Sequence, residues 1–223
     1  MPARTRTDLV ITVSVEAAPK KAFATAVDWP GWSRSGKDER SALAALAAAA
    51  PRYAIVARTA AETFVADGYE VVERSGAGSG TEFGVPSAIT PLDRRPVSSE
   101  EADRMVRLVA AAWSVLDRIA ASAPADLRKG PRGGGRDRDK MLGHLIESDW
   151  TYAREMGIRE QQPDAADRAA IQAIRAAMLE ILRQPSDGAP LAGRKWPPRF
   201  AARRIAWHAL DHAWEMEDRT ERG

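Results

Sequence analysis

The chain has 223 residues, of which 44% are hydrophobic and 29% are charged, a balance typical of globular proteins. Its 33 lysines and arginines nearly match its 31 aspartates and glutamates, and the two signs alternate along the chain, so nucleic acid is not an expected partner. Cysteine is absent, which excludes disulfides, a cysteine nucleophile and thiolate metal ligands. Any sulfur chemistry would therefore use sulfur supplied by another molecule.

The distribution of apolar residues predicts a cytoplasmic protein of two domains. No apolar run is long enough to span a membrane and no charged-then-apolar leader is present, so we expect no membrane partner. We predict a small α+β domain over residues 1–83, a proline-containing linker over 84–97 and an all-α domain over 98–223.

The α+β domain begins with segments rich in β-branched residues. Strands are predicted where apolar residues alternate or concentrate, at 8–16, 21–28 and 69–74, with a further short polar strand after a Pro-Gly turn. An alanine-rich helix is predicted over 37–50, and Pro51 should end or kink it. Trp29 and Trp32 flank the turn, and we interpret them as exposed residues available for an interdomain contact.

The segment 21–36, Lys-Ala-Phe-Ala-Thr-Ala-Val-Asp-Trp-Pro-Gly-Trp-Ser-Arg-Ser-Gly, is followed by an acidic helix start and an Ala-Leu-rich helix. This order resembles the HicB-type α+β domain over about residues 8–75. The resemblance implies a small antiparallel sheet plus a helix. HicB domains occur in antitoxins, but no DNA-binding motif adjoins this one, so we do not transfer that role.

The second domain is predicted to contain four helices joined by turns. Ser98 and Glu101 have the spacing of a capping box at the start of the first helix. The helices are expected at 98–121, 137–156, 163–185 and from 197 onward. Such helices form a four-helix bundle, in which metal sites are built from inward-facing side chains. The basic, glycine-rich tract at 128–138 reads as a solvated loop, although contact with an anionic ligand is an alternative.

Two of the three histidines, His208 and His212, lie four residues apart in the last predicted helix. Residues at this spacing lie one above the other on a helix, so both imidazoles can bind one metal ion. The third histidine, His144, falls within the predicted helix 137–156. If the two helices pack with His144 facing the pair, a site of three imidazoles follows. The alternative is that the histidines are ordinary hydrogen-bonded core residues.

The segments His-Leu-Ile-Glu-Ser-Asp-Trp at 144–150 and Ala-Trp-His-Ala-Leu-Asp-His-Ala-Trp-Glu at 206–215 resemble the signature segments of the DinB superfamily. The resemblance spans about residues 98–220. It implies that His144, His208 and His212 bind one divalent ion, with water completing its coordination. The superfamily contains thiol-dependent enzymes, including bacillithiol transferases and the mycothiol-dependent maleylpyruvate isomerase, together with many members of unknown reaction.

Three imidazoles suit zinc or nickel, and also iron or manganese. We expect a small-molecule substrate and a transferase mechanism, in which a low-molecular-weight thiol such as mycothiol is activated at the metal. Metal-dependent hydrolysis is the rival reaction. Glu215 shares a helix face with His212 and is the candidate base or further ligand; solvated surface ion pairing is its alternative. Glu147 and Asp211 each lie three residues after a histidine, within reach of its second nitrogen.

A non-enzymatic function is the second hypothesis. The helical domain would then be a non-catalytic, metal-stabilised module, with the HicB-like domain mediating association. Formation of a homodimer is left open by the sequence.

Overall fold

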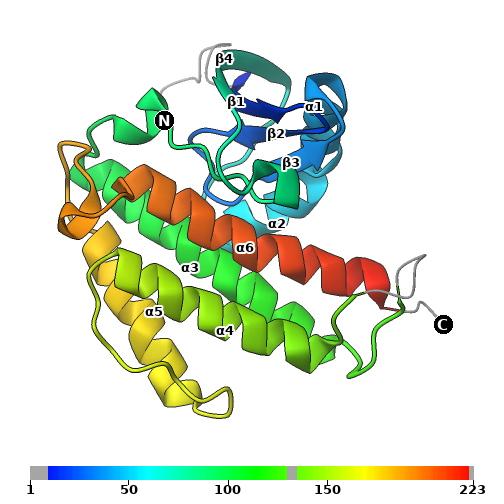
Figure 1. Cartoon of the computed structure of the whole chain (residues 1–223), viewed down its shortest axis with the longest axis vertical. Helices are drawn as coiled ribbons and strands as arrows, with labels where there is room; N and C mark the ends of the chain where they lie inside the picture. The colour runs from blue at the N-terminus through cyan, green and yellow to red at the C-terminus, as the bar shows by residue number, and fades with distance from the viewer. Residues whose placement is uncertain (1–9, 130–134, 221–223) are drawn as a thin grey trace.

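The computed structural model describes residues 10–129 and 135–220 and has an α+β fold (Figure 1). A four-stranded mixed sheet near the N-terminus is followed by long helices, as the predicted order of elements required. Buried apolar side chains from the sheet and from the helices belong to one continuous core. The predicted division at residues 83 and 98 therefore stays a prediction, since the packing crosses it.

The sheet contains β1 (Val10–Ala18), β2 (Lys21–Ala26), β3 (Ser33–Gly36) and β4 (Gly68–Gly76) in the order β3-β2-β1-β4. Strands β1, β2 and β3 pair antiparallel through short turns. Strand β4 instead runs parallel to β1, because the chain passes through two helices before it returns to the sheet. The predicted antiparallel sheet is thus corrected to a mixed one.

The helices α1 (Glu39–Ala48) and α2 (Ala50–Thr59) lie between β3 and β4 in the chain. The side chain of Asp38 caps α1, and Pro51 occupies the first turn of α2, where a missing N–H is tolerated. Trp32 is completely buried and donates from its indole to the carbonyl of Leu46. Its predicted exposure was wrong, since the tryptophan stacks on Tyr53 and packs beneath these helices. Trp29, predicted to be exposed as well, is partly buried and packs edge-on against Tyr53.

Four long helices follow, α3 (Ser99–Ser122), α4 (Arg138–Glu155), α5 (Arg168–Leu182) and α6 (Pro198–Arg219). In Figure 1, α6 lies between the sheet and α4, and α3 lies beside it. Helix α3 contacts α5 and α6, and α4 contacts the same two helices. The predicted capping box of Ser98 and Glu101 is confirmed at the start of α3, and Gly157, with φ of +92°, follows α4.

Helix α5 begins several residues later than predicted. The side chain of Asp164 accepts a hydrogen bond from the N–H of Ala166, which holds this segment in a turn. Asp167 then caps the helix by accepting from the N–H of Ala170. Short 3₁₀ turns occur at η2 (Thr81–Phe83), η3 (Pro91–Arg94) and η4 (Leu191–Gly193).

The sheet is fixed to α6 at two points. Phe23 of β2 packs edge-on against Trp207 of α6, with ring centroids 6.2 Å apart. Gly31, in the turn before β3, approaches Ala206 and Leu210 so closely that a Cβ atom would lie 2.8–2.9 Å from their side chains. The N-terminal unit therefore rests on the helix that carries two histidines. Within the described ranges, no helix is long and apolar enough to cross a membrane.

Candidate metal centre

Helices α4 and α6 bring the three histidines of the chain together. The ring centroids of His208 and His212 lie 4.9 Å apart, and that of His144 lies 5.0 Å from the first and 5.4 Å from the second. One nitrogen of each ring can be chosen so that all three lie within 4.8 Å of one another. This grouping follows from the four-residue spacing on α6 and from the packing of α4 against it.

The residues fit a divalent ion because each α6 histidine has one ring nitrogen already engaged. The Nδ1 atom of His212 lies 3.0 Å from the carboxylate of Glu215, and the Nδ1 atom of His208 lies 3.1 Å from the hydroxyl of Tyr152. A histidine that donates from Nδ1 presents the lone pair of Nε2 to a metal. Zinc–nitrogen distances of about 2.1 Å place the nitrogens of a tetrahedral site roughly 3.4 Å apart, so the three nitrogens, now within 4.8 Å of one another, would draw closer around a bound ion.

Glu215 is held from both sides. One carboxylate oxygen binds His212, and the other accepts a hydrogen bond from Arg219 at 2.8 Å. Arg219 in turn donates to the backbone carbonyls of Arg128 and Arg136. The hydrogen bond from His212 keeps the pKa of Glu215 below its usual value, and the bond from Arg219 adds to the effect. Glu215 is therefore an ionised residue that orients His212.

Burial keeps two of the imidazoles neutral. His208 is only 7% exposed, and the loss of solvation lowers its pKa well below the usual value, with the His212 and Arg204 charges adding to the shift. Burial also lowers the pKa of His144, helped by the charge of Arg136. A neutral imidazole is the form that binds metal, so both histidines are in the required state at neutral pH.

The predicted partners of the histidines are corrected in two places. Asp211, expected to reach His208, instead accepts a hydrogen bond from Arg34 of β3 at 2.8 Å. Glu147, expected to reach His144, is exposed and makes no hydrogen bond to that ring among the described residues. Glu215, expected as a base or a further ligand, serves as the hydrogen-bond partner of His212.

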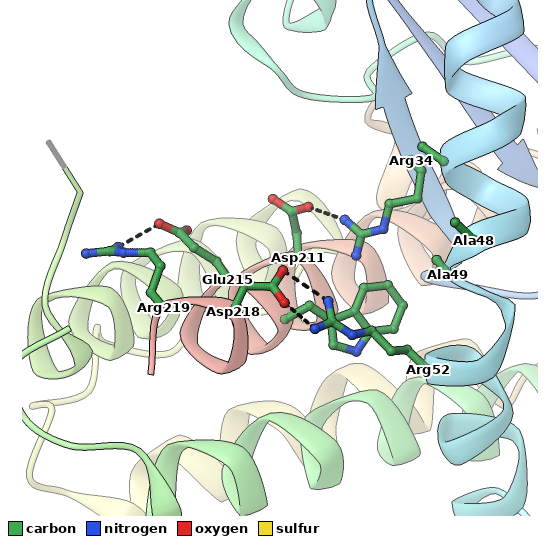
Figure 2. A pocket seen from close by; sticks show the side chains of 10 residues that line it. Arg34, Ala48, Ala49, Arg52, Asp211, Glu215, Asp218 and Arg219 are labelled. Atoms are coloured by element: carbon green, nitrogen blue, oxygen red, sulfur yellow. Dashed lines mark hydrogen bonds and ion pairs between the residues drawn. The ribbon is translucent and has the colours of Figure 1, made fainter. Parts of the chain in front are cut away.

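A groove of about 630 Å³ lies beside this centre, between α6 and the helices α1 and α2 (Figure 2). Figure 2 shows three arginines on its walls, each directed at a carboxylate of α6. The pairs are Arg34 with Asp211, Arg52 with Asp218 and Arg219 with Glu215. Among the described residues no histidine lines the groove, and Glu215, which binds His212, is a wall residue that the groove shares with the surroundings of the centre.

Three residues around the centre were missed in the sequence: Tyr152, Arg204 and Arg219. Tyr152 lies eight residues after His144 and thus near the same face of α4. Arg204 lies four residues before His208, and Arg219 lies four residues after Glu215, both on α6. Extending the stripe of His208 and His212 in both directions would have found these two arginines.

No protein-family model, curated protein or solved structure matches the chain. The resemblances to the HicB and DinB families therefore remain predictions from short segments. The site stands on its own geometry, which is independent of any family.

Proposed function

We propose that this protein is a metal-dependent enzyme of the DinB type. It would transfer a low-molecular-weight thiol to an electrophilic small molecule at the centre formed by His144, His208 and His212. The observation that carries the proposal is the convergence of three imidazoles from α4 and α6 within 4.8 Å. Zinc and nickel are the preferred ions, and iron and manganese suit the same ligands.

The ligand set favours a catalytic centre over a structural one. Structural zinc sites are closed by four protein ligands, whereas catalytic sites keep one position open. In the described part of the chain the group contains three ligand side chains. His144 is only partly buried, and the His212 side chain keeps 12% of its exposure. This partial exposure to solvent supports a centre with an accessible side over a purely metal-stabilised module.

The state of Glu215 favours thiol transfer over hydrolysis. Hydrolysis needs a general base to accept a proton from water, and Glu215 was the residue expected to supply it. Both of its oxygens are engaged, by His212 and by Arg219, and its pKa is lowered. A carboxylate in this state is a poor proton acceptor. A thiol ionises far more easily than water, so its reaction depends less on a protein base.

Each side chain around the centre would have a distinct role in holding the ion or orienting its ligands. His144, His208 and His212 would hold the ion, which when bound supplies Lewis acidity that favours the anion of a thiol in the open position. Glu215 and Tyr152 would fix the ring orientation and tautomer of the two α6 histidines. Trp207, stacked on His208 with an interplanar angle of 13°, would exclude water from its flank.

The first test is the metal content of the purified protein by elemental analysis. We expect about one divalent ion per chain, and loss of that ion in His144→Ala and in His208→Ala while circular dichroism shows the fold retained. Asp211→Asn is the matched control, because this α6 carboxylate binds Arg34 and no histidine. Unchanged metal content in both histidine variants would overturn the site.

The second test is turnover. Metal-loaded protein is mixed with a bacterial thiol, such as mycothiol or cysteine, and an electrophile, and loss of the free thiol is followed. Consumption should require the metal and should vanish in His208→Ala. Metal binding without consumption of any thiol, together with ester cleavage, would favour the hydrolase instead.

A further inference from the structure

Arg204 is a partly buried cation that has no carboxylate partner among the described residues. Five arginines with side chains less than 20% exposed form ion pairs with carboxylates, and these are Arg34, Arg175, Arg199, Arg203 and Arg219. Arg204 makes no ion pair with a carboxylate among the described residues, and beside its contact with the Tyr152 side chain its Nη1 atom is buried without a hydrogen-bond partner. An unpaired buried charge is costly, so such a group is usually kept for a reason.

Aromatic rings enclose this guanidinium. Its Cζ atom lies 4.9 Å from the ring centroid of Trp207 and 5.5 Å from that of Tyr152. The indole Nε1 of Trp207 is a second buried donor without an acceptor among the described residues. Burial lowers the pKa of Arg204, which reflects how far its charge is removed from water. Two hydrogen-bond donors from one turn of α6 thus lack an acceptor.

The nearest acidic candidate is already used. Glu16 of β1 accepts hydrogen bonds from the hydroxyl of Thr81 and from the N–H groups of Ser87 and Ala88. The carboxylate of Glu16 therefore already binds residues 81–88, which follow β4. The neighbouring Arg203 binds Asp93 through two hydrogen bonds of 2.7 and 2.9 Å, so this carboxylate is engaged as well. The described residues therefore offer Arg204 no carboxylate, and a ligand could supply one.

We propose that Arg204 binds a carboxylate group of the substrate, next to the metal centre. A guanidinium recognises a carboxylate through paired, charge-assisted hydrogen bonds. A single positive charge among aromatic rings balances one negative charge, which favours a monoanion such as a carboxylate over a dianionic phosphate. Arg204 as a residue keeps partial exposure, so the guanidinium can be approached from solvent.

The position of Arg204 relates this subsite to the reaction. Arg204 precedes His208 by four residues, about 6 Å along the helix axis. Both Tyr152 and Trp207, which flank the guanidinium, also contact His208. The link to the metal rests on the proposed function. With the metal at the histidines, the substrate would be a short carboxylate whose reacting atom lies a few bonds from its anionic end.

The anion site can be tested without metal. Propionate is titrated into the metal-free protein by calorimetry, with propionamide as the uncharged control and inorganic phosphate as the dianionic one. We expect propionate alone to bind measurably, and Arg204→Met to weaken its binding at least tenfold. Arg204→Lys should retain part of the affinity. Arg118→Met, which removes an exposed charge on α3, should leave the affinity unchanged. Equal binding of propionate to wild type and to Arg204→Met would overturn the proposal, as would preferential binding of phosphate.

The relation to the metal centre is tested with cobalt-loaded protein. 3-Mercaptopropionate and the uncharged 3-mercapto-1-propanol are compared through the thiolate-to-cobalt absorption band. Wild type should bind the carboxylate-bearing thiol at least tenfold more tightly, and Arg204→Met should bind both alike while retaining its cobalt. If cobalt uptake does not depend on the histidines but propionate binding still needs Arg204, the anion site stands and the proposed function fails. If cobalt binds through the histidines and Arg204→Met keeps the preference for the carboxylate, the metal centre of the proposed function stands and the anion site at Arg204 fails.

Discussion

Nδ1 of His212 donates a hydrogen bond to Glu215 at 3.0 Å, and the other oxygen of Glu215 accepts from Arg219 at 2.8 Å. The imidazole is therefore held in one orientation by a carboxylate that is itself held in place. A hydrogen bond at Nδ1 leaves Nε2 free and raises its basicity as a metal ligand. The geometry of this pair indicates that Glu215 acts through His212.

Replacing Glu215 with glutamine should weaken metal binding. Glutamine keeps the size of the side chain but removes the negative charge that the His212 ring faces. Changes of this kind cost roughly 10- to 100-fold in metal affinity. Competition against a chromophoric chelator measures the dissociation constant for zinc.

The control for this variant is Asp211→Asn, a carboxylate on the same helix that pairs with Arg34 at 2.8 Å. We expect its zinc affinity to stay within a factor of about two of wild type. Equal losses in the two variants would mean that the effect comes from the general charge of α6 and not from the His212 contact.

Tyr152→Phe tests the second hydrogen bond to the centre. The phenol oxygen lies 3.1 Å from Nδ1 of His208, and both residues are buried. Removing the hydroxyl leaves a buried ring nitrogen without a partner, which costs about 1–3 kcal/mol of stability. Chemical denaturation of the metal-free protein should show this loss, and zinc affinity should fall as well. A variant as stable as wild type, with unchanged zinc affinity, would argue against the bond.

The sequence predicted the histidines better than their partners. The spacing of His208 and His212 fixes their relation within one helix, and the helical pattern around His144 placed the third ring on another. The hydrogen-bond partners could not be read in the same way. Tyr152 is 56 residues from His208, and Arg34 is 177 residues from Asp211, so only tertiary packing decides these pairs.

The pairing of the strands could not be predicted from the sequence either. Alternating apolar residues located the strands, but the pattern of a strand does not name its neighbour. Residues 68–76 pair parallel to β1 only because α1 and α2 carry the chain back along the sheet. Trp32 was misjudged for a related reason: its neighbours Pro30 and Gly31 indicate a surface turn, while Tyr53 and Phe64 cover the ring from distant segments.

The contact between the sheet and α6 should be sensitive at Gly31. This glycine has φ of +91°, and an added Cβ would meet Leu210 at 2.8 Å and Ala206 at 2.9 Å. Gly31→Ala combines an unfavourable backbone conformation with a clash, so we expect it to cost about 2 kcal/mol or more. The free energy of unfolding, measured by denaturant titration, checks this value.

Gly143→Ala is the matched control. Gly143 lies within α4, and an added Cβ would meet nothing within 4 Å. Alanine in place of an unconstrained helical glycine stabilises by roughly 0.5–1 kcal/mol. The free energy of unfolding should therefore fall in Gly31→Ala and rise in Gly143→Ala. Destabilisation by Gly143→Ala, or a neutral Gly31→Ala, would contradict the packing described for these helices.

A buried ion pair among the helices predicts the pH dependence of stability. Asp149 of α4 lies 3.3 Å from Arg175 of α5, and both side chains are less than 10% exposed. Arg175 also binds the half-exposed Asp117 of α3 at 3.0 Å. Burial raises the pKa of Asp149 to about 6, because the loss of solvation outweighs the attraction of Arg175.

This shift has a definite sign. Because the folded pKa of Asp149, about 6, exceeds its ordinary value of 3.8, the folded state binds more protons than the unfolded state between these two pH values. The stability contributed by Asp149 is therefore greatest below pH 4 and is lost as the pH rises through 6. The change amounts to about 3 kcal/mol.

Asp149→Asn removes this titration, so the free energy of unfolding of the variant minus that of wild type should increase from pH 4 to pH 6 and level off above pH 7. Denaturant titrations of both proteins across this range measure the difference, and a flat or falling difference would show that the pair with Arg175 keeps Asp149 ionised throughout.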